Sequence, residues 1–185
     1  MVFKVEKSQA VNNLRVSDSV GDVDRELMPL LEKINNLPDF YTTSSCGGRV
    51  VLMQDLGSKK LDNFVGKWHR KVSMEDVFPL FKPCDGLLWF RYESPILHVM
   101  ARSLDKASWF LHLCRESGFK RSGIQSVKDE RILIEVLSTE RIDVPIMSEG
   151  RKLVSEEYIN FLIEQANIKY DLGTHKLDRL EKNLG

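Results

Sequence analysis

A run of small polar residues, YTTSSCGGRVVL at 41–52, places four hydroxyls and a thiol just before an arginine. Alternation along an extended strand puts Ser45 on one face and Ser44 and Cys46 on the other. Neither face is apolar, so hydrophobic burial does not explain this strand. A hairpin turn with satisfied hydroxyls and a ligand site are both consistent with the pattern.

The glycines that follow predict a close turn. Gly47 and Gly48 let the backbone bend sharply and let a ligand come near. Arg49 then offers five donors in a planar fork that suits a carboxylate or a phosphate. The glycines lead into a strand, and the chain contains no GxGxxG and no Walker loop, so a Rossmann-type nucleotide site is not expected.

A second polar segment, SPILHVMARS at 94–103, predicts a two-faced strand. Leu97 and Val99 share the expected core face, and His98 and Arg102 share the other. A histidine and an arginine on one face can meet a polar ligand. A satisfied histidine in a second layer of structure explains the pattern equally well.

A third segment, KWHRKV at 67–72, surrounds a tryptophan with basic groups. Trp68 with His69 and Arg70 beside it is typical of stacking on an exposed base combined with phosphate contact. A solvated loop with one tucked tryptophan gives the same pattern.

The segment FKRSGIQS at 119–126 is a smaller version of the opening run. Lys120 and Arg121 precede Ser122 and Gly123 where the chain turns from helix to strand. The same two interpretations remain open here.

Composition limits the function classes. The 185 residues suit a single compact domain, residues 1–185, and 42% hydrophobic with 29% charged residues is typical of a soluble globular protein. No signal peptide and no apolar run of membrane-spanning length is found. Lys plus Arg equals Asp plus Glu, 27 each, so any nucleic-acid surface must be local.

The three cysteines are widely spaced, and no Cys/His cluster has metal-ligand spacing. Reduced thiols in the cytoplasm and no bound metal are therefore expected. A nucleophilic Cys46 would need a base nearby, which the sequence does not show.

The order of predicted elements is not a strict βαβ alternation, which favours an α+β fold with a mixed sheet and packed helices. Pro29 predicts a kink or a late start in the helix at 22–36, and Gly173 predicts a break before a last helix. The remaining expected helices are 2–17, a short one after Ser73, 104–117, 155–170 and 174–183. The expected strands are 40–46, 49–55 and the pairs GLLWFRYE/ILHVMARS and FKRSGIQS/RILIEVLS.

Taken in order, the segments TTSSCGGRVVL, ILHVMARS, SGFKRSG, VPI and LVSEEYINFLIEQAN resemble the tRNA wybutosine-synthesising protein 3 family. The resemblance covers about residues 22–170. One position departs from it, since Gly47 stands where the family usually has Ser or Ala.

The resemblance implies an S-adenosylmethionine-dependent methyltransferase of the archaeal stand-alone form. Its implied substrate is phenylalanine tRNA, methylated on a ring nitrogen (N-4) of the tricyclic guanosine beside the anticodon. A cytoplasmic protein without membrane association, and a monomer in preference to an oligomer, is expected. Alternatives are a non-catalytic RNA-binding module and a cysteine-dependent hydrolase using Cys46.

The clustering of small polar and basic residues in these matching segments suggests roles around a cleft between the 41–52 run and the LHVMAR strand at 97–102. The expected catalytic residues are Ser45, Arg49 and His98. The expected cofactor-binding residues are Ser44, Cys46, Gly48, Arg102, Ser122 and Gly123. The expected substrate contacts are Trp68, His69, Arg70, Lys120 and Arg121.

Overall fold

The computed structural model describes residues 2–57 and 63–185 and confirms the α+β class. The helices are α1 (Val2–Ser19), α2 (Met28–Asn36), α3 (Met74–Val77), α4 (Leu104–Glu116) and α5 (Glu156–Asn183), with 3-10 turns at Arg25–Leu27 and Phe78–Leu80. The strands are β1 (Phe40–Cys46), β2 (Arg49–Asp55), β3 (Asn63–Trp68), β4 (Leu87–Glu93), β5 (Ile96–Ala101), β6 (Gly123–Lys128), β7 (Arg131–Leu137), β8 (Arg141–Ser148) and β9 (Arg151–Lys152).

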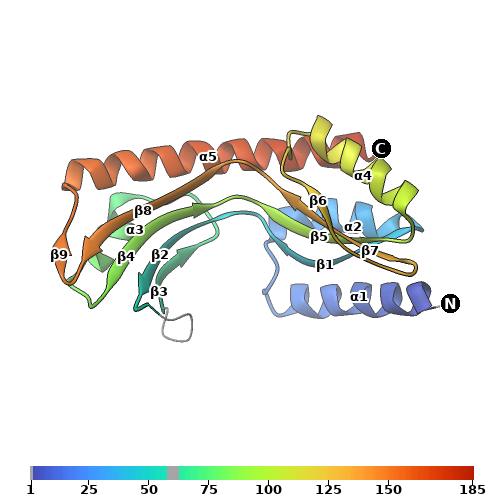
Figure 1. Cartoon of the computed structure of the whole chain (residues 1–185), viewed down its shortest axis with the longest axis horizontal. Coiled ribbons are helices and arrows are strands. Elements are labelled where there is room, and N and C mark those ends of the chain that lie inside the picture. Colours follow the sequence, from blue (N-terminus) through green and yellow to red (C-terminus); the bar gives the residue numbers. More distant parts are fainter. Residues whose placement is uncertain (1, 58–62) are drawn as a thin grey trace. The chain divides into compact units, whose positions relative to one another are not determined.

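The chain divides into two compact units (Figure 1). Unit 1 comprises residues 1–47, 95–139 and 173–185, and unit 2 comprises 48–94 and 140–172. Each unit has a hydrophobic core of its own. The expectation of one domain over residues 1–185 stays a prediction.

The strands form two antiparallel sheets in place of the expected mixed sheet. Unit 1 holds the order β1-β5-β7-β6, and unit 2 holds β3-β2-β4-β8-β9. Every pairing between the described strands is antiparallel, because no helical crossover returns a strand alongside its neighbour in the same direction.

The sheet of unit 1 has one face turned to a helical core. Along β5 the side chains alternate between buried and half-buried, with Leu97 and Val99 inside as predicted. Helices α2 and α4 and the part of α5 from residue 173 onward contribute to the same core. His98 is therefore left on the sheet face that this core does not use.

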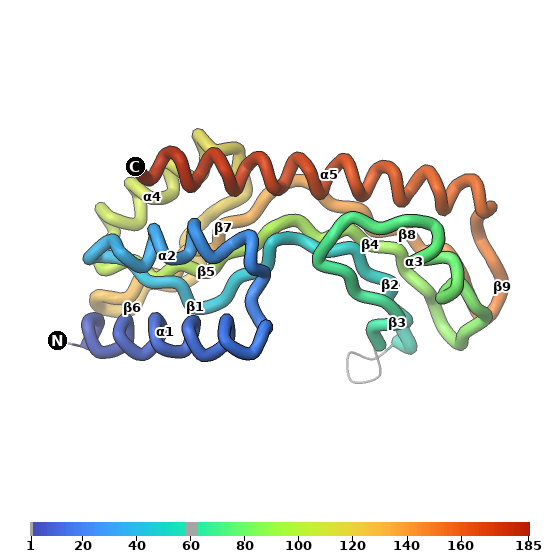
Figure 2. The backbone as a smooth tube through the Cα atoms, turned by 180° about the vertical axis from the view of Figure 1, so that it is seen from behind, coloured from blue at the N-terminus to red at the C-terminus, as the bar shows by residue number. Residues whose placement is uncertain are grey.

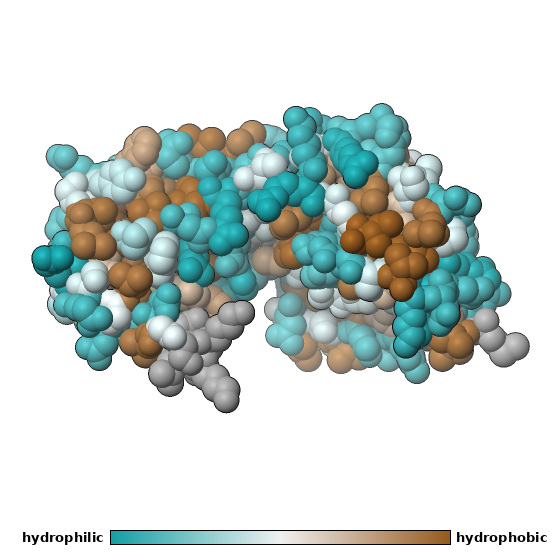
Figure 3. All heavy atoms as spheres, in the orientation of Figure 1, coloured by the Kyte–Doolittle hydropathy of each residue, from teal (hydrophilic) through white to brown (hydrophobic). Residues whose placement is uncertain are grey.

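Helix α1 lies beside β1, as both ribbon views show (Figure 2). Phe3 is its one buried residue, and the Phe3 ring lies 5.1 Å from the ring of Tyr41 on β1. The remaining side chains of α1 are mixed in polarity, and the space-filling view shows apolar and polar residues interspersed (Figure 3). Most of α1 thus keeps its side chains available to solvent or to a ligand.

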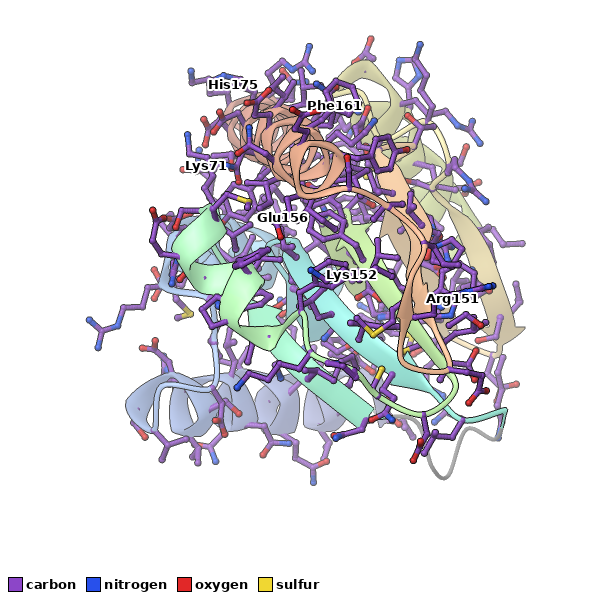
Figure 4. All side chains as sticks on the ribbon, turned by 90° about the vertical axis from the view of Figure 1, so that its left-hand side faces the viewer. Lys71, Arg151, Lys152, Glu156, Phe161 and His175 are labelled. Atoms are coloured by element: carbon purple, nitrogen blue, oxygen red, sulfur yellow. The ribbon has the colours of Figure 1, made fainter. Side chains whose placement is uncertain are left out.

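Unit 2 packs its sheet against the first half of α5 and the short α3. Ile159, Leu162 and Ile163 of α5 are buried with Phe90 and Tyr92 of β4. At the α3 end, the Lys152 ammonium lies over the Phe78 and Phe81 rings, 5.6 and 4.9 Å from their centroids (Figure 4). This contact and an ion pair to Glu156 at 3.5 Å connect β9 to its surroundings.

Most predicted elements are confirmed, but the strand expected at 119–126 begins only at Gly123, and the expected break at Gly173 is absent. Pro29 does delay its helix: the chain makes a 3-10 turn at Arg25–Leu27 and begins α2 at Met28. Gly173 does not break α5, which continues to Asn183, because a single glycine costs a helix only about 1 kcal/mol. In residues 2–57 and 63–185, no helix has the length and hydropathy of a membrane span.

Candidate functional site

The polar run and the histidine strand are hydrogen-bonded neighbours in unit 1. Strand β1 pairs with β5 so that Ser44 lies opposite His98. The Ser44 hydroxyl is 2.8 Å from His98 Nδ1, and the Thr43 hydroxyl donates to the His98 carbonyl at 3.4 Å. The expected cleft between these two strands is therefore wrong, because main-chain pairing joins them directly.

A pocket of about 340 Å³ instead opens between the polar end of β1 and helix α1. Its lining residues from β1 are Thr42, Thr43, Ser44 and Ser45, and those from α1 and the following turn are Ala10, Asn13, Leu14, Ser17, Asp22 and Val23. A β-bulge between Thr42 and Ser44 lets consecutive hydroxyls face the pocket. The size is at the lower end of small-molecule sites.

The pocket wall is fixed by two hydrogen-bonded clamps. The Asn35 amide accepts from Thr42 N–H and donates to the Thr42 hydroxyl, both at 2.9 Å. The carboxylate of Asp24 accepts from Gly47 N–H at 2.7 Å. A side chain on residue 47 would place its Cβ 3.3 Å from that carboxylate, so the unusual glycine relieves a tight contact.

Sequence reasoning missed these clamps and the contribution of α1 to the pocket, although it did predict a helix at 2–17. Asn35 ends a helix, where asparagine is common, and Asp24 precedes a helical turn, so each has an ordinary local explanation. The spacing of Ala10, Asn13 and Ser17 on one helical face was the available signal.

Tyr41 anchors the other end of β1 to α1. Its hydroxyl donates to the Glu6 carboxylate at 3.1 Å, and Arg131 donates to the same carboxylate at 2.8 Å. Burial, followed by the bond to Glu6, raises the pKa of Tyr41 to about 12. Helix α1 is thus held against β1 by a neutral phenol over the whole physiological range.

Arg49 and Gly48 follow the polar run and lie in unit 2. Arg49 donates from Nε to Glu93 on β4 and lies over the Phe64 ring at 5.6 Å. Gly48 has a φ of 102°, which favours glycine regardless of any ligand. Their cofactor and catalytic roles stay predictions.

Cys46 and Arg102 flank the paired strands of unit 1. Cys46 lies opposite Ile96 and is half-buried. Arg102 lies 3.9 Å from Asp39, whose carboxylate also binds Lys106 at 3.1 Å. Neither residue lines the pocket beside β1.

Several side chains of the segment at 67–72 are engaged by other residues of unit 2. Trp68 packs on the core of that unit, over Gly66, where an added Cβ would come within 2.3 Å of its ring. Arg70 holds both carboxylate oxygens of Asp76, at 2.8 and 2.7 Å, and depresses the pKa of that carboxyl far below its usual range. The backbone carbonyl of His69 accepts from Tyr170 at 3.1 Å.

The turn at 120–123 shows one structural role clearly. The Ser122 hydroxyl is buried, donates to the Phe119 carbonyl at 2.9 Å and accepts from Leu137 N–H at 3.2 Å. Lys120 and Arg121 are exposed, and Gly123 begins β6 opposite Glu135. This turn does not line the pocket beside β1.

The comparisons with known proteins agree over almost the full chain. The family model described as Methyltransferase TYW3 matches residues 5–185. A Pyrococcus furiosus protein named tRNA(Phe) 7-((3-amino-3-carboxypropyl)-4-demethylwyosine(37)-N(4))-methyltransferase 1 is 41% identical, covering 98% of this chain and 94% of its own. A Methanocaldococcus jannaschii protein named as the same N(4)-methyltransferase is 35% identical, with 98% and 100% covered.

Solved structures show the same fold. The PH1069 protein from Pyrococcus horikoshii superimposes with a TM-score of 0.93 at 39% identity, covering 99% of this chain and 96% of that one. A hypothetical protein from Aeropyrum pernix gives a TM-score of 0.78 at 29% identity, with 87% and 96% covered. On the strength of the family match, the chain belongs to the TYW3 methyltransferase family.

Proposed function

We propose that this protein is a cytoplasmic, S-adenosylmethionine-dependent methyltransferase that acts on N4 of the 7-aminocarboxypropyl-demethylwyosine base beside the anticodon of phenylalanine tRNA. The observation that carries the proposal is that relatives bearing this name are 35–42% identical over nearly the whole chain. The absence of a metal and a monomeric state remain part of the proposal.

The pocket beside β1 fits the donor's chemistry. S-adenosylmethionine carries a methyl group on a positively charged sulfonium, which it supplies to a nucleophilic nitrogen. Asp22 is an acceptor for ribose hydroxyls or an ammonium, and Ser44 and Ser45 can donate to a carboxylate. Leu14 and Val23 supply apolar wall for a base.

Among the described residues that line the pocket, none carries a positive charge. A sulfonium would therefore meet hydroxyl dipoles and one carboxylate, which favour a positive charge, and no repelling ammonium. Arg49 and Arg102, each placed against a carboxylate, are not needed for this environment.

His98 is placed to handle a proton at the edge of this pocket. Ser44 both lines the pocket and bonds to His98 Nδ1 at 2.8 Å. When Nδ1–H donates to Ser44, Nε2 carries a lone pair that can accept the proton a ring nitrogen loses on methylation. Ser44 then orients the imidazole, and the rest of catalysis is positioning.

The hydrolase alternative is less well supported. A cysteine nucleophile needs an activating base. Cys46 does not line the pocket beside β1.

The experiment that tests the main proposal is transfer of labelled methyl from S-adenosylmethionine to phenylalanine tRNA that carries the hypomodified tricyclic base. Label should enter that tRNA and not unmodified transcript, and label in neither would refute the proposal.

A further inference from the structure

A second pocket, called the groove from here on, opens on another face of α1. It has a volume of about 520 Å³ and is lined by Lys4, Lys7, Ser8, Val11, Asn12, Arg15 and Asn35. The α1 residues recur every three or four positions, so they form one stripe along the helix. From Lys4 to Arg15 this stripe runs roughly 16 Å along the axis, which exceeds what one small anion fills.

The stripe is cationic and its charge is largely unopposed. Its described lining residues include two lysines and an arginine, and none of them is acidic. The side chains of Lys4 and Arg15 are exposed and form no hydrogen bond or ion pair with any other residue that the structure describes. Glu6, the acid nearest in sequence, is turned away and holds Tyr41 and Arg131.

Lys7 lies deeper and its partners leave a positive balance. Its ammonium donates to the Leu37 carbonyl, and burial lowers its pKa while Asp39 opposes that shift. Asp39 also serves Lys106 at 3.1 Å and Arg102 at 3.9 Å. Asp39 is thus engaged by two cations outside the groove, so it offsets the charge of Lys7 only in part.

We propose that this groove binds backbone phosphates of the tRNA on which the neighbouring pocket acts, an inference that rests on the proposed function. Repeated cations along one stripe match the repeated charges of a polynucleotide.

A single hydrogen-bonded pair, Asn35 and Thr42, connects the two pockets. Asn35 lines the groove and holds Thr42 by two hydrogen bonds, and Thr42 lines the pocket beside β1. Phosphate binding in the groove would therefore position the tRNA strand that carries the target base. It would also support the wall of the pocket beside β1.

The test is the salt dependence of binding to phenylalanine tRNA transcript. The variant Lys4→Gln/Arg15→Gln removes two groove charges, and Arg115→Gln/Lys128→Gln removes two exposed charges elsewhere on unit 1 as the matched control. Losing two phosphate contacts should reduce the slope of log K against log salt by roughly 1.4 to 1.8. The control should keep the wild-type slope.

A methylation assay supplies the second readout. In the groove variant the KM for tRNA should rise while kcat at saturating tRNA and S-adenosylmethionine affinity stay as in the wild type. A wild-type salt slope in the groove variant, or an equal loss in the control, overturns the proposal. In one outcome the wild type transfers no methyl group, while the salt slope of tRNA binding still falls only in the groove variant. That result would refute the proposed function and support phosphate binding in the groove.

Discussion

The basic segment at 67–72 in unit 2 and the α1–β1 region of unit 1 differ in how they use polar side chains. In unit 2, Arg70 is held by Asp76, and Lys71 lies 2.9 Å from Asp171. In unit 1, the hydroxyls of Ser44 and Ser45 line a pocket, and the charges of α1 line a groove. In the denser run of basic residues, Arg70 and Lys71 are already paired with carboxylates.

This difference shows that a basic run in sequence is not the same as available positive charge. Arg70 and Lys71 pair with carboxylates on neighbouring elements, whereas the side chains of Lys4 and Arg15 on α1 have no such partner among the residues that the structure describes. Binding chemistry is thus favoured where the fold leaves polar groups facing space.

The largest difference between the two regions is expected when His98 and His69 are replaced. His98→Ala should reduce kcat for methyl transfer by about 10²–10⁴-fold, because it removes the proton acceptor that Ser44 orients. His69→Ala leaves the Ser44–His98 pair intact and changes no residue that lines the pocket beside β1, so kcat should change little. Single-turnover methylation at saturating tRNA measures both, with the exposed α4 residue His112 replaced by Ala as control. Equal losses at His98 and His69 would contradict the assignment.

Two buried or half-buried asparagines form matched clamps in the two units. Asn35 bonds to the N–H and hydroxyl of Thr42, and Asn167 bonds to the N–H and carbonyl of Val72. Replacing either by Ala should lower the free energy of unfolding by about 1–3 kcal/mol, because a partner is left unsatisfied.

Only the Asn35 clamp belongs to the pocket wall. Asn35→Ala should therefore also weaken S-adenosylmethionine binding, and Asn167→Ala should not. Denaturant melts give the stability change, and calorimetric titration gives the affinity. Loss of affinity in both variants would mean that the effect is general destabilisation.

The smallest expected effect concerns Arg70. Its two hydrogen bonds keep the pKa of Asp76 depressed, so this pair contributes stability above pH 3.8 that is lost as the pH falls toward the folded pKa. Arg70→Ala should return the Asp76 pKa toward 3.8 in a carboxyl NMR titration and leave tRNA affinity within about twofold. A large affinity loss would show that Arg70 exchanges Asp76 for phosphate.

Much of the fold could be predicted from the pattern of apolar and polar residues in the sequence. Strands β1 and β2 begin and end where alternation and the glycine pair predicted, and the core face of β5 is the predicted one. The continuity of α5 through Gly173 did not follow, because burial of Leu177 and Leu180 outweighs the weak helix preference of one glycine. Strand β3 was not predicted, since KWHRKV was read for its charge alone.

The site was only half visible in sequence. Ser44, Ser45 and His98 attracted notice because polar residues on a strand face are unusual, and pairing of β1 with β5 brings Ser44 to His98. The contribution of α1 depends on which strand edge the helix covers, which is a tertiary property. The same holds for Asn35, whose partner Thr42 is fixed only by packing.

The most direct test is calorimetric titration of S-adenosylmethionine into the wild type, Ala10→Trp and Asn12→Trp. Ala10 lines the pocket beside β1, so an indole there should fill it, whereas Asn12 lines the groove on another face of the same helix. Wild type and Asn12→Trp should release heat and Ala10→Trp should not, with unchanged circular dichroism in all three. Binding by Ala10→Trp equal to that of the wild type, or no heat from the wild type, would contradict the placement of the methyl donor.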